Sequence, residues 1–297
     1  AAAQQLVLRQ LLSSDGQGRE FVVHPEIRSM ALTQLSAQER RLAHQVAAEH
    51  YTAQHNFLEA AQQWRAGEQP ERAAHLLIEH QRDLIDNLQI EELAALIARF
   101  RPADLAPGLW ARLKILAGEL AEFTHNFAVA LAEYQQALAA PDLQTKALAY
   151  YRRAKAFEQT NSDESLAHYG RAVQLLEATG AATSAAEERL ILLGNIYIDR
   201  AWLQMQVRAD LPRAEADLLR ARSLLNAAPG LRNRPIWSDL DNALGEFYHR
   251  SGQPQLAVEH NWQAWLTANE ARDLERMSKT AHNLGLVYMD NLRQYDR

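Results

Sequence analysis

Apolar residues recur every three or four positions along most of this chain, a spacing that places them on one face of a helix. Proline falls at or near the ends of these periodic stretches, where helix geometry tolerates it. The one β element expected is a hairpin, with strands 7–13 and 19–23 around a turn sequence at 15–18. The expected helices are 26–35, 38–54, 58–67, 70–87, 89–100, 107–124, 127–139, 143–160, 163–179, 184–208, 211–227, 236–251, 254–269 and 273–291.

Short motifs repeat within this helical pattern. His55, Asn56 and Phe57 return as His125, Asn126 and Phe127, and both His residues are expected in turns at helix ends. A second motif, Leu-Gly-x-x-Tyr, begins at Leu193, Leu244 and Leu284. Small residues keep a 35-residue register at Ala60, Ala95, Ala130 and Ser165.

These spacings indicate stacked pairs of antiparallel helices. A Gly in one helix and an Ala in the next let the two backbones approach closely, while Leu and Tyr fill the space between pairs. A Gly or Asn at a turn accepts the left-handed conformation that ends a helix. Since each pair buries one face only against its neighbours, the sequence predicts an all-α solenoid.

The pattern resembles the tetratricopeptide repeat (TPR) family over residues 38–297. The likeness is strongest at 244–265, where Gly245, Tyr248, Gly252, Ala257 and Ala264 match the family motif. The unit at 184–227 is longer and looks like the variant repeats of bacterial sensor proteins. The resemblance implies a right-handed α-α superhelix.

The N-terminal residues carry a second resemblance. His24 and Pro25 end a strand, and Ser36 with Glu39 forms a capping box that opens the next helix. This junction is similar to the end of the winged-helix domain in signal-transduction ATPases with numerous domains (STAND), the class of the maltose-regulator-like activators. The expected domains are a winged-helix remnant at 1–37, arm helices and degenerate repeats at 38–104, and sensor repeats at 105–297.

Both ends are expected to continue. The chain contains no Gly-x-x-x-x-Gly-Lys-Ser/Thr run, so any ATPase domain implied by the resemblance would lie upstream of Ala1. The segment 284–295 matches a first repeat helix, which predicts a partner helix after Arg297.

Composition narrows the function classes. The chain has no Cys, which excludes disulfide scaffolds, thiol catalysis and thiolate zinc sites. Its formal charge of −6 gives no broad basic field, so direct binding of nucleic acid is not expected. No run of 18 apolar residues and no signal peptide occur, and we expect a cytoplasmic protein without a membrane span.

No motif favours an enzyme. His75 and His80 are five residues apart, which puts them on different helix faces, and no His-Glu-x-x-His occurs. Adjacent carboxylates such as Glu91 and Glu92 also point to different faces. We therefore expect no catalytic residue, no metal and no cofactor on this chain. Most Trp residues are expected in repeat packing, with Trp237 or Trp265 as alternatives for a ligand surface.

The TPR resemblance implies that the first helix of each pair lines a concave groove. Its inward positions include eight acids against three bases, and the Lys/Asn set that clamps a peptide carboxylate in co-chaperones is not reproduced. A basic or polar peptide, or a hydroxylated small molecule, would suit such a wall, unless the groove simply stays wet. The candidate binding residues are Arg112, Glu119, Glu122, Tyr150, Phe157, Asn195, Asp199, Asn242, Glu246, His249 and His282.

The function that this combination favours is recognition of a protein, peptide or small-molecule effector by the sensor module of a STAND ATPase. In that class, effector binding would shift a closed, ADP-bound form towards an open form that self-associates. The alternative is a constitutive protein–protein interaction scaffold, and an enzyme is a distant third.

Overall fold

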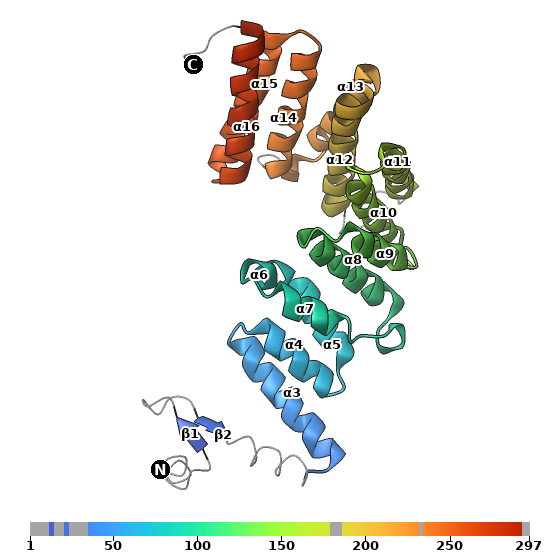
Figure 1. Ribbon diagram of the computed structural model, residues 1–297, viewed down its shortest axis with the longest axis vertical. Coiled ribbons are helices and arrows are strands. Elements are labelled where there is room, and N and C mark those ends of the chain that lie inside the picture. Colours follow the sequence, from blue (N-terminus) through green and yellow to red (C-terminus); the bar gives the residue numbers. More distant parts are fainter. Residues whose placement is uncertain (1–11, 15–20, 24–34, 179–185, 232–233, 293–297) are drawn as a thin grey trace. The chain divides into compact units, whose positions relative to one another are not determined.

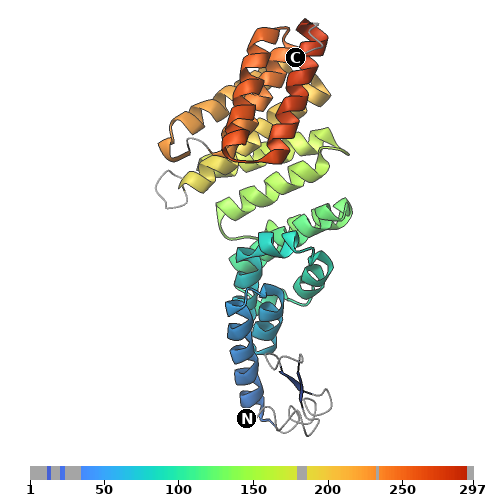
Figure 2. The same cartoon turned by 90° about the vertical axis from the view of Figure 1, so that its left-hand side faces the viewer.

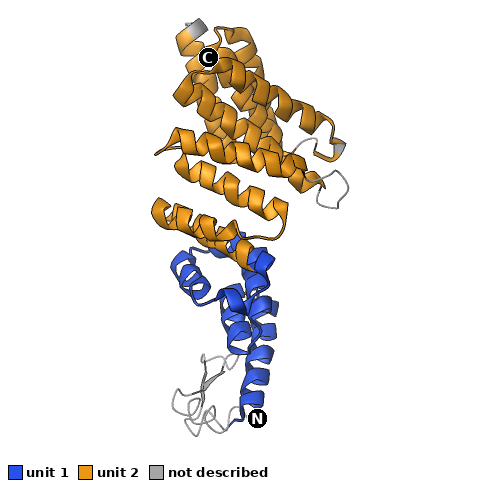
Figure 3. Cartoon of the chain, turned by 90° about the vertical axis from the view of Figure 1, so that its right-hand side faces the viewer, with its two compact units in different colours: residues 1–109 blue, residues 110–297 orange. Residues whose placement is uncertain are grey.

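The computed structural model describes residues 12–14, 21–23, 35–178, 186–231 and 234–292. The chain divides into two compact units, Ala1–Leu109 and Trp110–Arg297 (Figure 3). The sequence pattern places a boundary between residues 104 and 105, whereas the contacts divide the chain after Leu109, inside a helix. Within the described ranges, no helix combines the length and apolarity needed to cross a bilayer.

The first unit contains two short strands and a series of helices (Figure 1). The strands pair antiparallel, with Leu12 opposite Val23 and Ser14 opposite Phe21. The predicted turn at 15–18 and most of the predicted helix 26–35 lie outside the described residues, so the winged-helix assignment stays a prediction. The elements are β1 (Leu12–Ser14), β2 (Phe21–Val23), α3 (Ala37–Ala53), α4 (Phe57–Ala66), α5 (Pro70–Glu79), α6 (Gln81–Asp86), α7 (Ile90–Ile97) and the 3₁₀ turn η1 (Pro102–Asp104).

Local capping chemistry sets the start of α3. The Glu39 amide donates to the Ser36 hydroxyl at 3.2 Å, and the Ser36 amide donates to the Glu39 carboxylate at 2.8 Å. The predicted capping box is therefore present, and each half of it satisfies one backbone N–H that the helix leaves free. The Ser36 bonds also lower the pKa of Glu39.

Two of the turns between helices carry the repeated His-Asn-Phe motif. His55 and His125 both adopt a left-handed φ of 58°, which confirms them as turn residues. Asn56 and Asn126 then cap α4 and the helix at Phe127–Ala137.

Gly67 does not play the turn role that Gly usually plays. Its φ is −80°, and the following Glu68 takes the left-handed φ of 57°. A Cβ on Gly67 would lie 3.1 Å from the Gln45 side chain and 3.3 Å from the Arg41 carbonyl. The small residue is therefore needed where α4 ends against α3, and the turn itself falls one residue later.

The prediction of a single helix at 70–87 is wrong. The structure has two helices there, α5 and α6, joined at His80 with φ −105° and ψ 22°. The His80 ring stacks on Phe57 of α4, with ring centroids 3.6 Å apart and planes 6° apart. No Gly or Pro marks this break, so periodicity alone gives no sign of it.

The second unit is a stack of helix pairs (Figure 1). Its elements are α8 (Pro107–Phe123, which begins in the first unit), α9 (Phe127–Ala137), α10 (Leu143–Phe157), α11 (Ser162–Ala178), α12 (Ala186–Leu203), the π-helical turn η2 (Gln204–Arg208), α13 (Leu211–Asn226), the 3₁₀ turn η3 (Pro229–Leu231), α14 (Pro235–Arg250), α15 (Pro254–Glu270), α16 (Leu274–Val287) and the π-helical turn η4 (Tyr288–Leu292).

Packing in this unit follows the order of the chain. Within each pair α10 packs on α11, α12 on α13 and α14 on α15. Successive first helices also touch, α10 with α12, α12 with α14 and α14 with α16. Figure 2 shows the helices of this unit from another side. This arrangement is that of an α-solenoid, in which each pair completes its core against its neighbours.

Glycines in the first helices mark the closest approaches. A Cβ on Gly118 would lie 2.3 Å from the Tyr134 ring, and one on Gly245 would lie 2.6 Å from Asn261. A Cβ on Gly194 would lie 2.9 Å from Ile236, while one on Gly285 would meet nothing within 4 Å. The Leu-Gly-x-x-Tyr motif therefore marks close contacts at its first two copies and an open position at its third.

Candidate functional site

A cavity lies on the face formed by the first helices of the second unit. It consists of two adjoining hollows of about 260 Å³ and about 460 Å³. Both are lined by Lys155, Asp199, Trp202 and Lys279. All lining residues come from α10 and its C-terminal end, α12 with η2, α14 and α16, and none from α11, α13 or α15.

An ionic network holds the α10 side of the cavity. The Tyr151 hydroxyl donates to Asp199 at 2.7 Å, and the Lys155 Nζ lies 3.4 Å from the same carboxylate. Lys155 also pairs with Glu158 at 3.5 Å, and Glu158 accepts a hydrogen bond from Tyr169. These contacts join α10, α11 and α12 around one ammonium group.

Burial and charge act in opposite directions on this network. Burial raises the pKa of Glu158, and Lys155 and Tyr169 partly offset that effect. For Lys155, burial acts to lower the pKa, but Asp199 and Glu158 outweigh it and the pKa is raised. Lys155 therefore remains charged and is shared between the two carboxylates at neutral pH.

A second ion pair closes the α14–α16 side. Arg276 donates from Nε and Nη2 to the two Asp239 oxygens, at 3.0 and 2.9 Å. It also pairs with Asp273, and these hydrogen bonds raise its pKa further. This bidentate geometry orients the guanidinium in a single plane against the carboxylate.

Trp202 and Lys279 lie where the two hollows meet. The Lys279 Nζ is 5.5 Å from the centre of the Trp202 ring, within the range of a cation–π contact. The sequence pattern assigned Trp202 to packing and left Trp237 or Trp265 as alternatives for a ligand surface. In the structure the Trp237 indole N–H donates to the Leu231 carbonyl at 3.0 Å, and Trp265 stacks on Trp262. Neither lines the cavity.

Of the residues predicted for the groove, Asn195 and Asp199 line the cavity directly. Tyr150 and Phe157 do not, because both rings face His168 on α11, at centroid distances of 5.6 and 5.5 Å. Tyr151 and Lys155 of α10, with Glu158 at its C-terminal end, line the cavity. Tyr151 follows the predicted Tyr150 by one residue, and one residue turns the face of a helix by about 100°.

Three further predicted residues lie nearer the start of the unit. Glu119 pairs with Arg152 at 2.5 Å, and burial raises the pKa of both Glu119 and Glu122 despite the charge of Arg152. Burial and the Glu122 carboxylate raise the pKa of Tyr134. Arg112 is exposed, and none of these residues lines the cavity.

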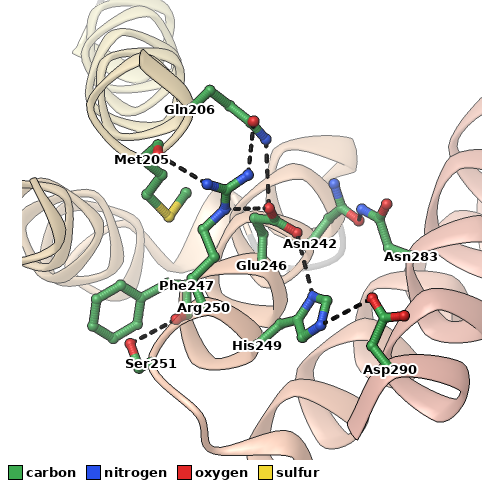
Figure 4. A network of polar contacts seen from close by, with 10 residues as sticks. All are labelled: Met205, Gln206, Asn242, Glu246, Phe247, His249, Arg250, Ser251, Asn283 and Asp290. Carbon is green, nitrogen blue, oxygen red and sulfur yellow. Dashed lines mark hydrogen bonds and ion pairs between the residues drawn. The ribbon is translucent and has the colours of Figure 1, made fainter. Parts of the chain in front are cut away.

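The predicted residues of α14 belong to a polar network that holds η2 (Figure 4). Arg250 donates to Glu246 at 2.5 Å, to the Met205 carbonyl at 3.0 Å and to the Gln206 side chain at 2.7 Å. His249 lies between Glu246 and Asp290, 3.9 and 3.8 Å from their oxygens.

One amide, Asn242, and one imidazole, His282, complete the predicted set. The Asn283 amide donates to Asn242 at 2.8 Å, which ties α16 to α14. His282 is exposed on α16 and does not line the cavity. Gln206 links the two regions, because it bonds Arg250 and also lines the larger hollow.

The structure shows that the wall carries more bases than the sequence pattern indicated. Three bases were not predicted there, and each neutralises a carboxylate on a neighbouring helix: Lys155, Arg152 and Arg276. A signal was present on α10, since Arg152 and Lys155 each lie two residues from a predicted position, Tyr150 and Phe157 respectively. In the described part of the chain, no group of three or more His, Asp or Glu side chains is arranged to hold a metal ion.

Similarity to known proteins is found among solved structures. No family model matches the chain, and no curated protein matches it. BtubC (BKLC) from P. vanneervenii is similar at 18% identity and a TM-score of 0.50, covering 76% of this chain and 84% of that one. At this identity the likeness concerns the fold alone.

A second similar structure is that of a STAND protein with a tetratricopeptide repeat sensor from Pyrococcus horikoshii. It is 13% identical, with a TM-score of 0.44, and the alignment covers 98% of this chain. This chain spans 50% of the length of that protein.

Proposed function

We propose that the second unit is a recognition module that binds a peptide or small-molecule effector in the cavity around Trp202. The observation that carries this proposal is the origin of the lining residues. They come from successive first helices, α10, α12, α14 and α16, so the stacking of repeats itself creates the site.

The size and chemistry of the cavity suit a ligand. The larger hollow, about 460 Å³, falls within the roughly 300–1,000 Å³ typical of ligand sites. Trp202 supplies a flat apolar surface, and Asn195 and Gln206 supply amides. The ion pairs of Lys155 and Arg276 hold the surrounding charges in position, which lowers the entropy lost on binding.

The same pairs favour recognition over catalysis. Asp199 and Asp239 are engaged by Tyr151, Lys155 and Arg276, whereas a general base needs a carboxylate that is free to take a proton. We place no reaction and no cofactor on this chain.

The wider role that we propose is that of the sensor arm of a multidomain STAND ATPase. It is supported by the sequence resemblance at the N-terminal junction and along the repeats. In this role, effector binding in the cavity would bias the parent protein between its closed and open forms. A constitutive scaffold would use the same helices without an effector.

The test is a ligand screen with cavity variants. Peptides and small molecules that raise the unfolding temperature of the chain are selected, because a ligand of the native state stabilises it. Their affinities are then measured for Trp202→Leu and for Trp262→Leu, which alters an exposed Trp on α15 outside the cavity.

We expect Trp202→Leu to weaken binding by about tenfold or more, as for a buried aromatic contact. We expect Trp262→Leu to leave affinity unchanged. If both variants bind every ligand found as tightly as the parent chain does, the proposed site is refuted.

A further inference from the structure

The carboxylates of the cavity have partners within the protein. Asp199 is held by Tyr151 and Lys155, and Glu158 by Lys155 and Tyr169. Asp239 receives two hydrogen bonds from Arg276. A cationic ligand would compete with Lys155 or Arg276 for these carboxylates, whose negative charge those two side chains already neutralise.

The cations of the cavity differ from one another in this respect. Lys155 and Arg276 are each engaged by two carboxylates. Lys279 contacts the Trp202 ring, and within the described ranges it forms no ion pair with a carboxylate. It is therefore the lining cation whose charge a ligand can meet without breaking an existing pair.

The position of Lys279 suits a ligand contact. It lines both hollows, and its Nζ lies 5.5 Å from the centre of the Trp202 ring. A ligand oxyanion that meets the ammonium on the side away from this ring would gain a charge-assisted hydrogen bond and keep the cation–π contact.

From these contacts we propose that the effector of this cavity is a small molecule bearing an oxyanion, a carboxylate or a phosphate, that pairs with Lys279. This inference rests on the proposed function of the cavity and specifies the chemical class of its ligand. It differs from the basic or polar peptide, or hydroxylated small molecule, that the acidic residues of the sequence suggested.

The experiment titrates the full chain with inorganic phosphate, succinate and choline, and follows the Trp202 indole N–H resonance by NMR. The resonance is assigned from Trp202→Phe. Lys279→Gln removes the proposed anchor, and Lys146→Gln is the matched control, since Lys146 lies on α10 and lines neither hollow.

We expect phosphate, succinate or both to shift the resonance saturably, and the response to one of them identifies the oxyanion. Lys279→Gln should weaken that binding about tenfold, the loss of one charge-assisted contact, with Lys146→Gln unchanged.

The inference would be overturned if choline alone bound saturably, or if both variants bound the anion equally well. It would also be overturned if neither anion shifted the resonance. None of these results bears on the proposed function, which fails only if no ligand from the screen depends on Trp202.

Discussion

Single glycine positions distinguish the helix pairs of the second unit. Gly118 lies against the fully buried ring of Tyr134, and Gly245 against the fully buried Asn261. Gly285 occupies the corresponding place in the last copy of the motif, and a side chain there would meet nothing within 4 Å. The same residue type is therefore required by packing at one position and only tolerated at another.

This difference predicts opposite effects of one substitution. Gly118→Ala should destabilise the chain by about 1–3 kcal/mol, because the new methyl group overlaps a ring that has no room to move. Gly285→Ala, the matched control, should stabilise it by about 0.5–1 kcal/mol, since Ala loses less backbone entropy in a helix. Urea unfolding of both variants measures the two changes, and equal effects would contradict the contacts described for Gly118.

At the scale of an element, η2 is the departure from regular helix nearest to the cavity. A π-helical turn leaves the ordinary hydrogen-bond pattern, and such turns are frequent at functional sites. Here Arg250 of α14 donates hydrogen bonds to the Met205 carbonyl and to the Gln206 side-chain oxygen, so a contact from the next pair stabilises the turn. Gln206 and Val207 of the turn then line the larger hollow.

Removal of this arginine should loosen η2. We expect Arg250→Ala to cost about 0.5–1.5 kcal/mol, because it removes the donor to the partly buried Met205 carbonyl and to the exposed Gln206 side chain. Amides of residues 204–208 should exchange faster with solvent, as measured by hydrogen–deuterium exchange. Arg213→Ala, which removes a largely exposed pair with Asp210, is the control and should change neither quantity appreciably. Unchanged exchange at η2 in Arg250→Ala would show that the turn holds without the network.

At the scale of the whole molecule, each of the two units has buried apolar residues of its own. Leu77 and Leu93 are fully buried in the first unit, and Tyr197 and Leu240 are almost completely buried in the second. In a chain of stacked repeats, the free energy of unfolding is close to the sum of the intrinsic stability of each repeat and the interactions between adjacent repeats. A cavity made in one unit should therefore weaken that unit more than the other.

Leu77→Ala tests this expectation. It should destabilise the first unit by about 2–5 kcal/mol, through lost burial and the cavity that remains. Hydrogen exchange should accelerate in α4, α5 and α7, while amides of α14 and α15 keep their protection. A uniform loss of protection along the chain would indicate that the chain unfolds as one cooperative body.

Much of the helical architecture could be predicted from the sequence, and less of the candidate site. The capping box at Ser36, the turns at His55 and His125 and most helix bounds follow from short-range rules. Asn195 and Asp199 were found because the motif around Gly194 sets their place on α12. Tyr151 and Lys155 were missed because the register carried from the family motif selects Tyr150 and Phe157, which lie on another face of α10.

The sequence by itself determined most of the helical segments and most of the positions where small side chains must lie, because periodicity, caps and turn residues act over a few positions. Only the tertiary structure decided which charges meet. Glu119 with Arg152, Asp199 with Lys155 and Asp239 with Arg276 are far apart in the chain, and each pair forms because two helices pack side by side. The break at His80 depends in the same way on a ring from another helix. The balance of charge in the cavity, and with it the kind of ligand it favours, is therefore a property of the packed helices.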